Sequence, residues 1–175
     1  GAFTASVNSP VCPHDTIFFQ ASASSGAVSY EWIGLSNAFY SQLQNPVTIA
    51  DSSMAGTYTV IAHSVNGCIS LQPQSVTVVV LPEPQVYIGP DTMVCMVPVY
   101  FLTASGNYPS YIWHDNTPGP QYPAQQTGLY SVMVTDSNGC HGYDSAYIEV
   151  IRCGPQAMNI FTPNSDGERK TEWCD

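Results

Sequence analysis

The sequence predicts an all-β protein built from two small β-sandwiches in tandem and a short C-terminal tail. Stretches in which apolar and polar residues alternate recur along the chain, and turn pairs such as Ser-Gly, Asn-Gly and Pro-Gly separate them. No window has convincing helical periodicity. An internal repeat places one tryptophan on a middle strand of each copy. Short strands at regular spacing around such a tryptophan indicate an immunoglobulin-like sandwich.

Both copies of the repeat follow one order of motifs. Each begins with a cysteine and an apolar strand, continues through a Tyr-x-Trp segment and a Gly-x-Tyr-x-Val segment, and ends with Asn-Gly-Cys and a closing strand. Cys12 and Cys68 are 56 positions apart and Cys95 and Cys140 are 45 apart, so the second copy is about 11 residues shorter. Most of the missing residues would lie between Trp113 and Tyr130.

The alternation also predicts each strand and the domain boundaries. The first domain covers 1–81, with strands near 15–21, 28–33, 46–50, 56–63 and 69–80. The second covers 82–151, with strands near 84–88, 97–103, 110–114, 128–136 and 143–151. The tail covers 152–175, and the Pro-rich stretch 81–85 is a stiff connector between the domains.

Four aromatic residues are expected in the two cores. Trp32 and Trp113 would fill the centres of the sandwiches. Tyr58 and Tyr130 lie where a corner tyrosine could anchor the loop before the next strand. Because these positions repeat, we expect the two cores to be built alike.

The charge distribution excludes several classes of partner. The net charge is −10, and all three cationic residues, Arg152, Arg169 and Lys170, lie after position 151. Binding to nucleic acid or to an anionic membrane surface requires lysine and arginine, so neither partner is expected. No apolar run approaches the roughly 18 residues of a membrane span. The chain begins without an initiator Met or a signal peptide, which suggests a mature or trimmed fragment of an exported protein.

The six cysteines predict disulfides and not a metal site. No C-x-x-C pair is present and no histidine groups with the cysteines, so we expect no metal and no cofactor. Disulfides are typical of extracellular or periplasmic proteins. The repeat pattern favours three pairs: Cys12–Cys68, Cys95–Cys140 and Cys153–Cys174.

The geometry of a sandwich leaves a second pairing open. The strand after Cys12 and the strand before Cys68 run the same way in opposing sheets, so the two cysteines fall at opposite ends of the domain. A seven-residue strand is about 23 Å long, whereas bonded cysteines have Cα atoms within about 7 Å. In a stacked pair of domains, Cys12 would instead face Cys140 of the second copy.

The repeats and the tail resemble a known class of secreted protein. The modules are similar to the Ig-like and PKD-like modules of large secreted proteins of Bacteroidota. The phrase "NIFTPNSDGE" resembles the opening of the gliding-motility-associated C-terminal domain, although Ser165 replaces a glycine and Arg169 and Lys170 replace the expected Asn and Asp. The matching residues are Asn159, Phe161, Thr162, Pro163, Asn164, Asp166 and Gly167. The resemblance implies export through the type IX secretion system, with the C-terminal domain removed or linked to the cell surface.

The same resemblance suggests candidate modification sites. Secreted proteins of this group can be O-glycosylated in Asp-Ser/Thr tripeptides that end in a small or aliphatic residue. Thr16, Thr92 and Ser145 lie in such tripeptides. Tripeptides of this kind also arise readily by chance.

The sequence carries no catalytic motif, so no enzyme is predicted. There is no G-x-S-x-G elbow, no H-E-x-x-H and no phosphate-binding glycine loop. Four tyrosines in or beside predicted loops are candidates for stacking on sugar rings or filling a partner's pocket: Tyr40, Tyr108, Tyr111 and Tyr122.

These observations predict a non-catalytic, extracellular segment of a cell-surface protein, acting as an adhesin or its stalk. Its partners would be other domains or copies of the same protein, and glycans or other surface polymers. Two alternatives stay open. One is a fibre subunit assembled head-to-tail or by strand-edge pairing, since the strands lack the lysines that blunt sheet edges. The other is a carbohydrate-binding accessory module of a secreted enzyme.

Overall fold

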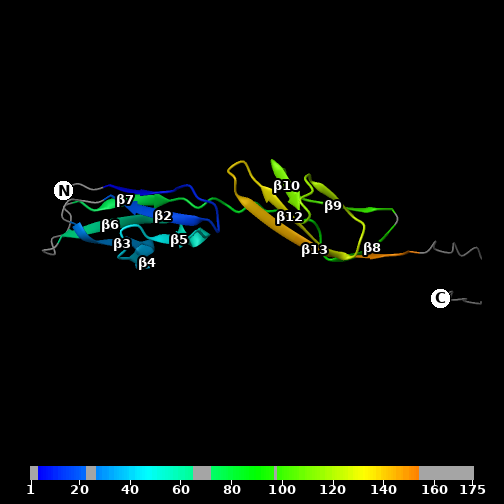
Figure 1. Ribbon diagram of the computed structural model, residues 1–175, viewed down its shortest axis with the longest axis horizontal. Helices are drawn as coiled ribbons and strands as arrows, with labels where there is room; N and C mark the ends of the chain where they lie inside the picture. Colours follow the sequence, from blue (N-terminus) through cyan, green and yellow to red (C-terminus); the bar gives the residue numbers. More distant parts are fainter. Residues whose placement is uncertain (1–3, 23–26, 65–71, 97, 154–175) are drawn as a thin grey trace, which may run out of the picture.

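A computed structural model describes residues 4–22, 27–64, 72–96 and 98–153. Within these ranges the protein is all-β, as predicted, and the only helical elements are two 3-10 turns, η1 (Leu35–Asn37) and η2 (Ser52–Met54). None of the described segments forms a helix that could span a membrane. The strands form two sandwiches placed end to end (Figure 1), which we call the first sandwich (β1–β7) and the second sandwich (β8–β13).

The first sandwich has an immunoglobulin-like topology. One sheet has the order β1-β2-β5, with bounds Ala5–Val7, Thr16–Ala21 and Val47–Ile49. The other has the order β4-β3-β6-β7, with bounds Phe39–Ser41, Ala27–Gly34, Gly56–Ser64 and Gln74–Val78. In immunoglobulin lettering these sheets are A-B-E and C′-C-F-G. After β1 the chain crosses to the second sheet, where Val11 pairs in parallel with Val80.

The second sandwich repeats this plan with fewer strands. One sheet pairs β11 (Gln121–Ala124) with β9 (Tyr100–Thr103). The other has the order β10-β12-β13-β8, with bounds Ser110–Trp113, Gly128–Thr135, His141–Ile151 and Thr92–Cys95. Here β8 runs parallel to β13, as Val11 does to Val80. The second sandwich has no counterpart of β4 among its described residues, and this accounts for most of its shorter repeat.

The two tryptophans lie at the centres of separate hydrophobic cores. Trp32 on β3 and Trp113 on β10 are 0% and 2% exposed. Each indole N–H donates to a backbone carbonyl, of Gln44 at 3.1 Å and of Gly119 at 2.8 Å. Buried indoles require such partners, because an unpaired polar group away from water is costly. The loops that supply these carbonyls are thereby tied to the cores.

Both corner tyrosines make the contact that their sequence position predicts. The hydroxyl of Tyr58, near the start of β6, donates to the carbonyl of Met54 at 2.7 Å. The hydroxyl of Tyr130, near the start of β12, donates to the carbonyl of Gln126 at 2.6 Å. Each bond reaches four residues back and holds the corner that leads into the strand.

Several strands differ from those predicted. The sequence did not reveal β1, β4, β8 and β11, which have three or four residues each. Residues 84–88, predicted as a strand, form none, although Ile88 is buried in the second core. Of the predicted strand 69–80, residues 69–71 lie outside the described part of the chain, and β7 covers Gln74–Val78.

Some predictions fall outside the described residues. The sorting-motif resemblance from Asn159 to Gly167 lies there, as do Cys68 and Cys174. The remaining four cysteines are described, and their pairing differs from the one the repeat favoured.

Candidate functional site

A disulfide joins the two sandwiches across their junction. Cys12 is bonded to Cys140, with Cα atoms 5.3 Å apart, and Cys95 is bonded to Cys153, with Cα atoms 5.4 Å apart. The favoured pairs Cys12–Cys68, Cys95–Cys140 and Cys153–Cys174 are therefore wrong. The alternative in which Cys12 reaches Cys140 is the one observed.

Strand direction explains why the favoured pairing fails. β2 and β6 both begin at the end of the first sandwich that faces the second, and β6 runs away from it to Ser64 (Figure 1). Eight steps along β6 cover about 26 Å, far beyond the reach of a disulfide. Cys12, which precedes β2, therefore lies beside the second sandwich and not beside the far end of its own.

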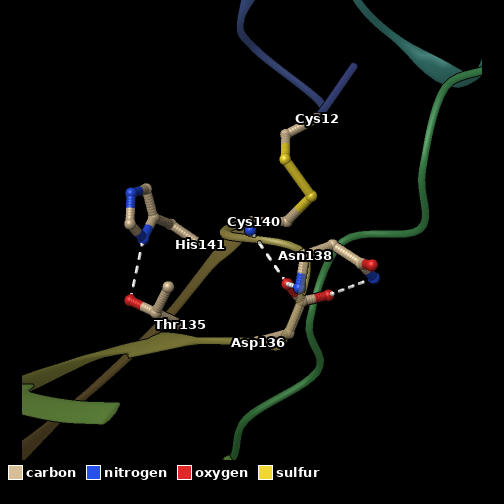
Figure 2. The surroundings of a disulfide bond; sticks show 6 residues. All are labelled: Cys12, Thr135, Asp136, Asn138, Cys140 and His141. Carbon is tan, nitrogen blue, oxygen red and sulfur yellow. Dashed lines mark hydrogen bonds between the residues drawn. A yellow bond between two sulfur atoms is a disulfide. The ribbon is translucent and has the colours of Figure 1, made fainter. Parts of the chain in front are cut away.

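The turn between β12 and β13 presents Cys140 to Cys12 (Figure 2). Oδ1 of Asp136 accepts hydrogen bonds from the backbone N–H groups of Asn138 at 2.8 Å and Cys140 at 2.9 Å. The N–H of Asp136 in turn donates to the carbonyl of Cys140 at 2.9 Å. Beside the turn, Thr135 Oγ1 and His141 Nδ1 lie 3.0 Å apart. One carboxylate thus holds the turn that carries Cys140.

The same hydrogen bonds set the ionisation of Asp136. Desolvation pulls the pKa of this carboxyl upward, but the N–H groups of Cys140, Asn138 and Gly139 and the Asn138 side chain outweigh it. The pKa of Asp136 therefore lies below its ordinary value. The carboxylate is consequently charged, and able to accept these bonds, at neutral pH.

The linker adds a second contact at the junction. The N–H of Leu81 donates to the carbonyl of Val11 at 2.9 Å, which continues the pairing of the first sandwich into the linker. Gly142, near the start of β13, packs so closely on the carbonyl of Pro84 that a Cβ atom would collide with it. An open groove of about 580 Å³ lies beside the disulfide, lined on one side by Asn8 and Phe18 and on the other by Asn138 and Gly139.

Three of the four candidate ligand tyrosines are engaged within the protein. The hydroxyl of Tyr108 donates to the carbonyl of Gln85 at 2.6 Å. Tyr111 is 9% exposed on β10 and donates to the carbonyl of Gly106 at 3.0 Å. Tyr122 lies on β11, and its hydroxyl donates to Asp115 at 2.8 Å. Their rings and hydroxyls serve the second sandwich.

Asp115 and Tyr122 influence each other's ionisation. Hydrogen bonds from the backbone of Thr117 and from the Tyr122 hydroxyl lower the pKa of Asp115 to about 2. The hydrogen bond to Asp115 raises the pKa of Tyr122, and burial adds to the shift. A carboxylate of such low basicity is a poor general base.

Tyr40 is the candidate tyrosine that faces solvent. It lies on β4, with 57% of its surface exposed, and its hydroxyl accepts a hydrogen bond from Gln42 Nε2 at 2.9 Å. A groove of about 700 Å³ runs beside it, with Glu31 and His63 among its lining residues. Glu31 Oε2 and His63 Nε2 lie 3.3 Å apart. Sequence reasoning missed this set because the pairing of β3 with β6 spans more than 20 residues of intervening chain.

The described residues contain no group of three or more histidine, cysteine or acidic side chains that could hold a metal ion.

The three candidate glycosylation sites differ in exposure. Ser145 is exposed on β13, whereas Thr16 and Thr92 are half-buried at the starts of β2 and β8. Ser145 is therefore the most accessible of the three.

Comparison with known proteins finds similarity to solved structures alone. No protein-family model matches the chain, and no curated protein matches it. Murine CEACAM1b is 12% identical over 86% of this chain and all of that one, with a TM-score of 0.39. The insect immune protein hemolin is 13% identical, over 80% of this chain and 44% of its own, with a TM-score of 0.42. The four N-terminal Ig domains of Dscam1 are 11% identical over 85% of this chain, with a TM-score of 0.33. The matched part spans 46% of that Dscam1 chain, which is less than half of its length.

Proposed function

We propose that this chain is a non-catalytic, extracellular segment of a cell-surface protein, in which two immunoglobulin-like sandwiches act as a stiffened stalk or adhesive unit. The disulfide between Cys12 and Cys140 carries the proposal, because it joins two domains that a linker already connects. A second connection removes most of the freedom of one domain to swivel on the other. Disulfides of this kind persist in oxidising compartments, which supports an exported protein.

The finer assignment rests on the sequence resemblance. The module pattern and the phrase from Asn159 to Gly167 support a secreted protein of the Bacteroidota type, exported by type IX secretion. Its expected partners are other domains or copies of the same protein and surface polymers. The absence of lysine and arginine before Arg152 argues against nucleic acid and against anionic membranes.

Small-angle scattering tests the stalk. The oxidised chain should give a narrow distribution of interdomain distances, and the double variant Cys12→Ser/Cys140→Ser should broaden it. The matched control is Cys95→Ser/Cys153→Ser, which removes a bond inside the second sandwich and should leave the distribution narrow. Equal distributions for all three proteins would refute a stiffening role.

Antibody labelling of intact producing cells tests the location, and a signal that requires permeabilised cells would refute surface exposure.

The cysteine count favours a fibre as the second candidate. Four of the six cysteines form the two described bonds, which leaves Cys68 and Cys174. Cys68 falls in the chain between β6 and β7. β6 ends and β7 begins at the end of the first sandwich away from the junction, whereas Cys174 follows the second sandwich in the chain. A bond between Cys68 of one copy and Cys174 of the next would link copies head to tail. Non-reducing electrophoresis should then show ladders that Cys68→Ser abolishes, and a monomeric band at all concentrations would exclude a fibre linked by this disulfide.

A further inference from the structure

The outer face of β4, β3 and β6 in the first sandwich carries a polar groove with one exposed ring. We propose that this groove binds a neutral saccharide, with the ring of Tyr40 as a stacking surface and with Glu31, Gln42 and His63 as hydrogen-bonding groups. This inference rests on the proposed function, because it names the class of ligand that an adhesive segment would bind.

Strand register brings the four side chains together. Tyr40 on β4 is paired with Ile33 on β3, and Gln42 follows two residues later, level with Glu31. On the other side of β3, Ser29 is paired with His63 of β6. Because Trp32 points into the core, its neighbour Glu31 points outward, as alternation requires. Three neighbouring strands thus supply one surface site.

Tyr40 supplies an apolar surface within this polar site. Its ring is 57% exposed, and the hydrogen bond from Gln42 restrains its hydroxyl end. A pyranose ring presents a face of C–H groups that can lie on an aromatic ring, while its hydroxyls project sideways. An aromatic side chain with two rotatable bonds provides such a contact at low entropic cost.

The remaining lining suits hydroxyl groups. A carboxylate accepts hydrogen bonds, an amide both donates and accepts, and a neutral imidazole does one of each. Glu31 and His63 keep 30% and 25% of their side-chain surface exposed, so both can reach a ligand. Sugar hydroxyls donate and accept at once, which matches this mixture better than an apolar peptide would.

Charge selects a neutral saccharide over a charged one. No lysine or arginine precedes Arg152, so the first sandwich has neither of these cations to offset the charge of a sulfated or acidic saccharide. Glu31 could attract a basic side chain of a partner protein. However, His63 Nε2 already lies 3.3 Å from this carboxylate and would compete with such a side chain for it. The neutral ligand is therefore favoured, and the basic one becomes an outcome of the test.

The test is a titration of the isotope-labelled, disulfide-bonded chain followed by NMR. The probes are cellohexaose, mannohexaose and chitohexaose as neutral saccharides, a hexasaccharide of galacturonic acid, and hexa-arginine. At least one neutral saccharide should shift the amide signals of 29–33, 40–42 and 61–64 saturably, with a Kd of about 1 mM or below. Tyr40→Ala and Glu31→Gln should each weaken that binding by about tenfold or more.

A matched control is Tyr147→Ala, which removes a tyrosine that is 46% exposed on β13 of the second sandwich. It should leave the affinity unchanged. Shifts with hexa-arginine alone would reassign the groove to a basic protein partner. The absence of shifts with every neutral saccharide at about 10 mM, or an equal loss in the Tyr147 variant, would overturn the inference. These outcomes leave the scattering result for the junction untouched, so the stalk and the saccharide site can fail separately.

Discussion

In the first sandwich the central tryptophan packs against a phenylalanine, whereas in the second its equivalent packs against a tyrosine. The rings of Trp32 and Phe19 have centroids 5.2 Å apart, and Phe39 from β4 closes the cluster at 5.3 Å from Phe19. In the second sandwich, which has no β4 counterpart, the ring of Tyr122 from β11 lies 5.2 Å from Trp113. A strand can therefore be lost when another ring covers the core and its hydroxyl finds a partner.

The outer faces of the two equivalent four-stranded sheets, β4-β3-β6-β7 and β10-β12-β13-β8, differ more than the cores do. In the first sandwich this face carries Glu31, Thr59 and His63, with Thr59 hydrogen-bonded to Ser75. In the second, Leu129 lies opposite Tyr147, and these side chains are 63% and 46% exposed. The fold constrains the inward positions and leaves the outward ones free to vary. Recognition by the two sandwiches is thus expected to differ.

The largest expected effect is the loss of stability when either central tryptophan is removed, and it tests whether the two indoles stabilise their cores equally. Trp32→Ala and Trp113→Ala should each lower the free energy of unfolding of their own sandwich by about 3–5 kcal/mol, because each leaves a large cavity. Urea denaturation followed by circular dichroism measures this. Tyr147→Ala, which alters an exposed ring, is the control. A loss below about 1 kcal/mol in either tryptophan variant would show that its core is not built around the indole.

Alanine substitutions at two glycines test whether close packing inside a sandwich and close packing at the junction are equally important for stability. A Cβ atom at Gly34 would collide with the ring of Tyr58, and one at Gly142 would collide with the carbonyl of Pro84. Replacement by alanine should cost about 1–3 kcal/mol at each site. Gly128→Ala is the control, because a Cβ atom there has no neighbour within 4 Å. A neutral Gly142→Ala in thermal denaturation would mean that the linker can move off β13.

The corner tyrosines should behave alike in the two sandwiches. Tyr58→Phe and Tyr130→Phe keep the buried rings but remove the hydrogen bonds to Met54 and Gln126. We expect each to reduce stability by about 1 kcal/mol. Chemical denaturation of both variants measures the loss. An effect in one sandwich and none in the other would show that the repeated motif has a structural role in only one copy.

The smallest effect is the response of the second sandwich to acid. The folded pKa of Asp115, about 2, lies below its ordinary value of 3.8. Its contribution to stability is therefore fully present above about pH 4 and is lost as the pH falls toward 2. Between pH 5 and 2.5, the melting temperature should fall less in Asp115→Asn than in the unaltered chain. Tyr122→Phe, which removes one of the hydrogen bonds, should give an intermediate slope, and identical slopes in all three would contradict this account.

The sequence by itself determined the fold class, the two cores and the corner tyrosines. Alternation and the spacing of Trp32, Tyr58, Trp113 and Tyr130 are local properties, and they follow directly from which faces must be buried. The tertiary structure alone decided between the two cysteine pairings. Repeat symmetry favoured bonds within a domain, but strand direction puts Cys12 against the next sandwich and Cys140 in the turn that meets it. The groove beside Tyr40 was likewise hidden, because Tyr40, Glu31 and His63 meet only through the pairing of β3 with β4 and β6.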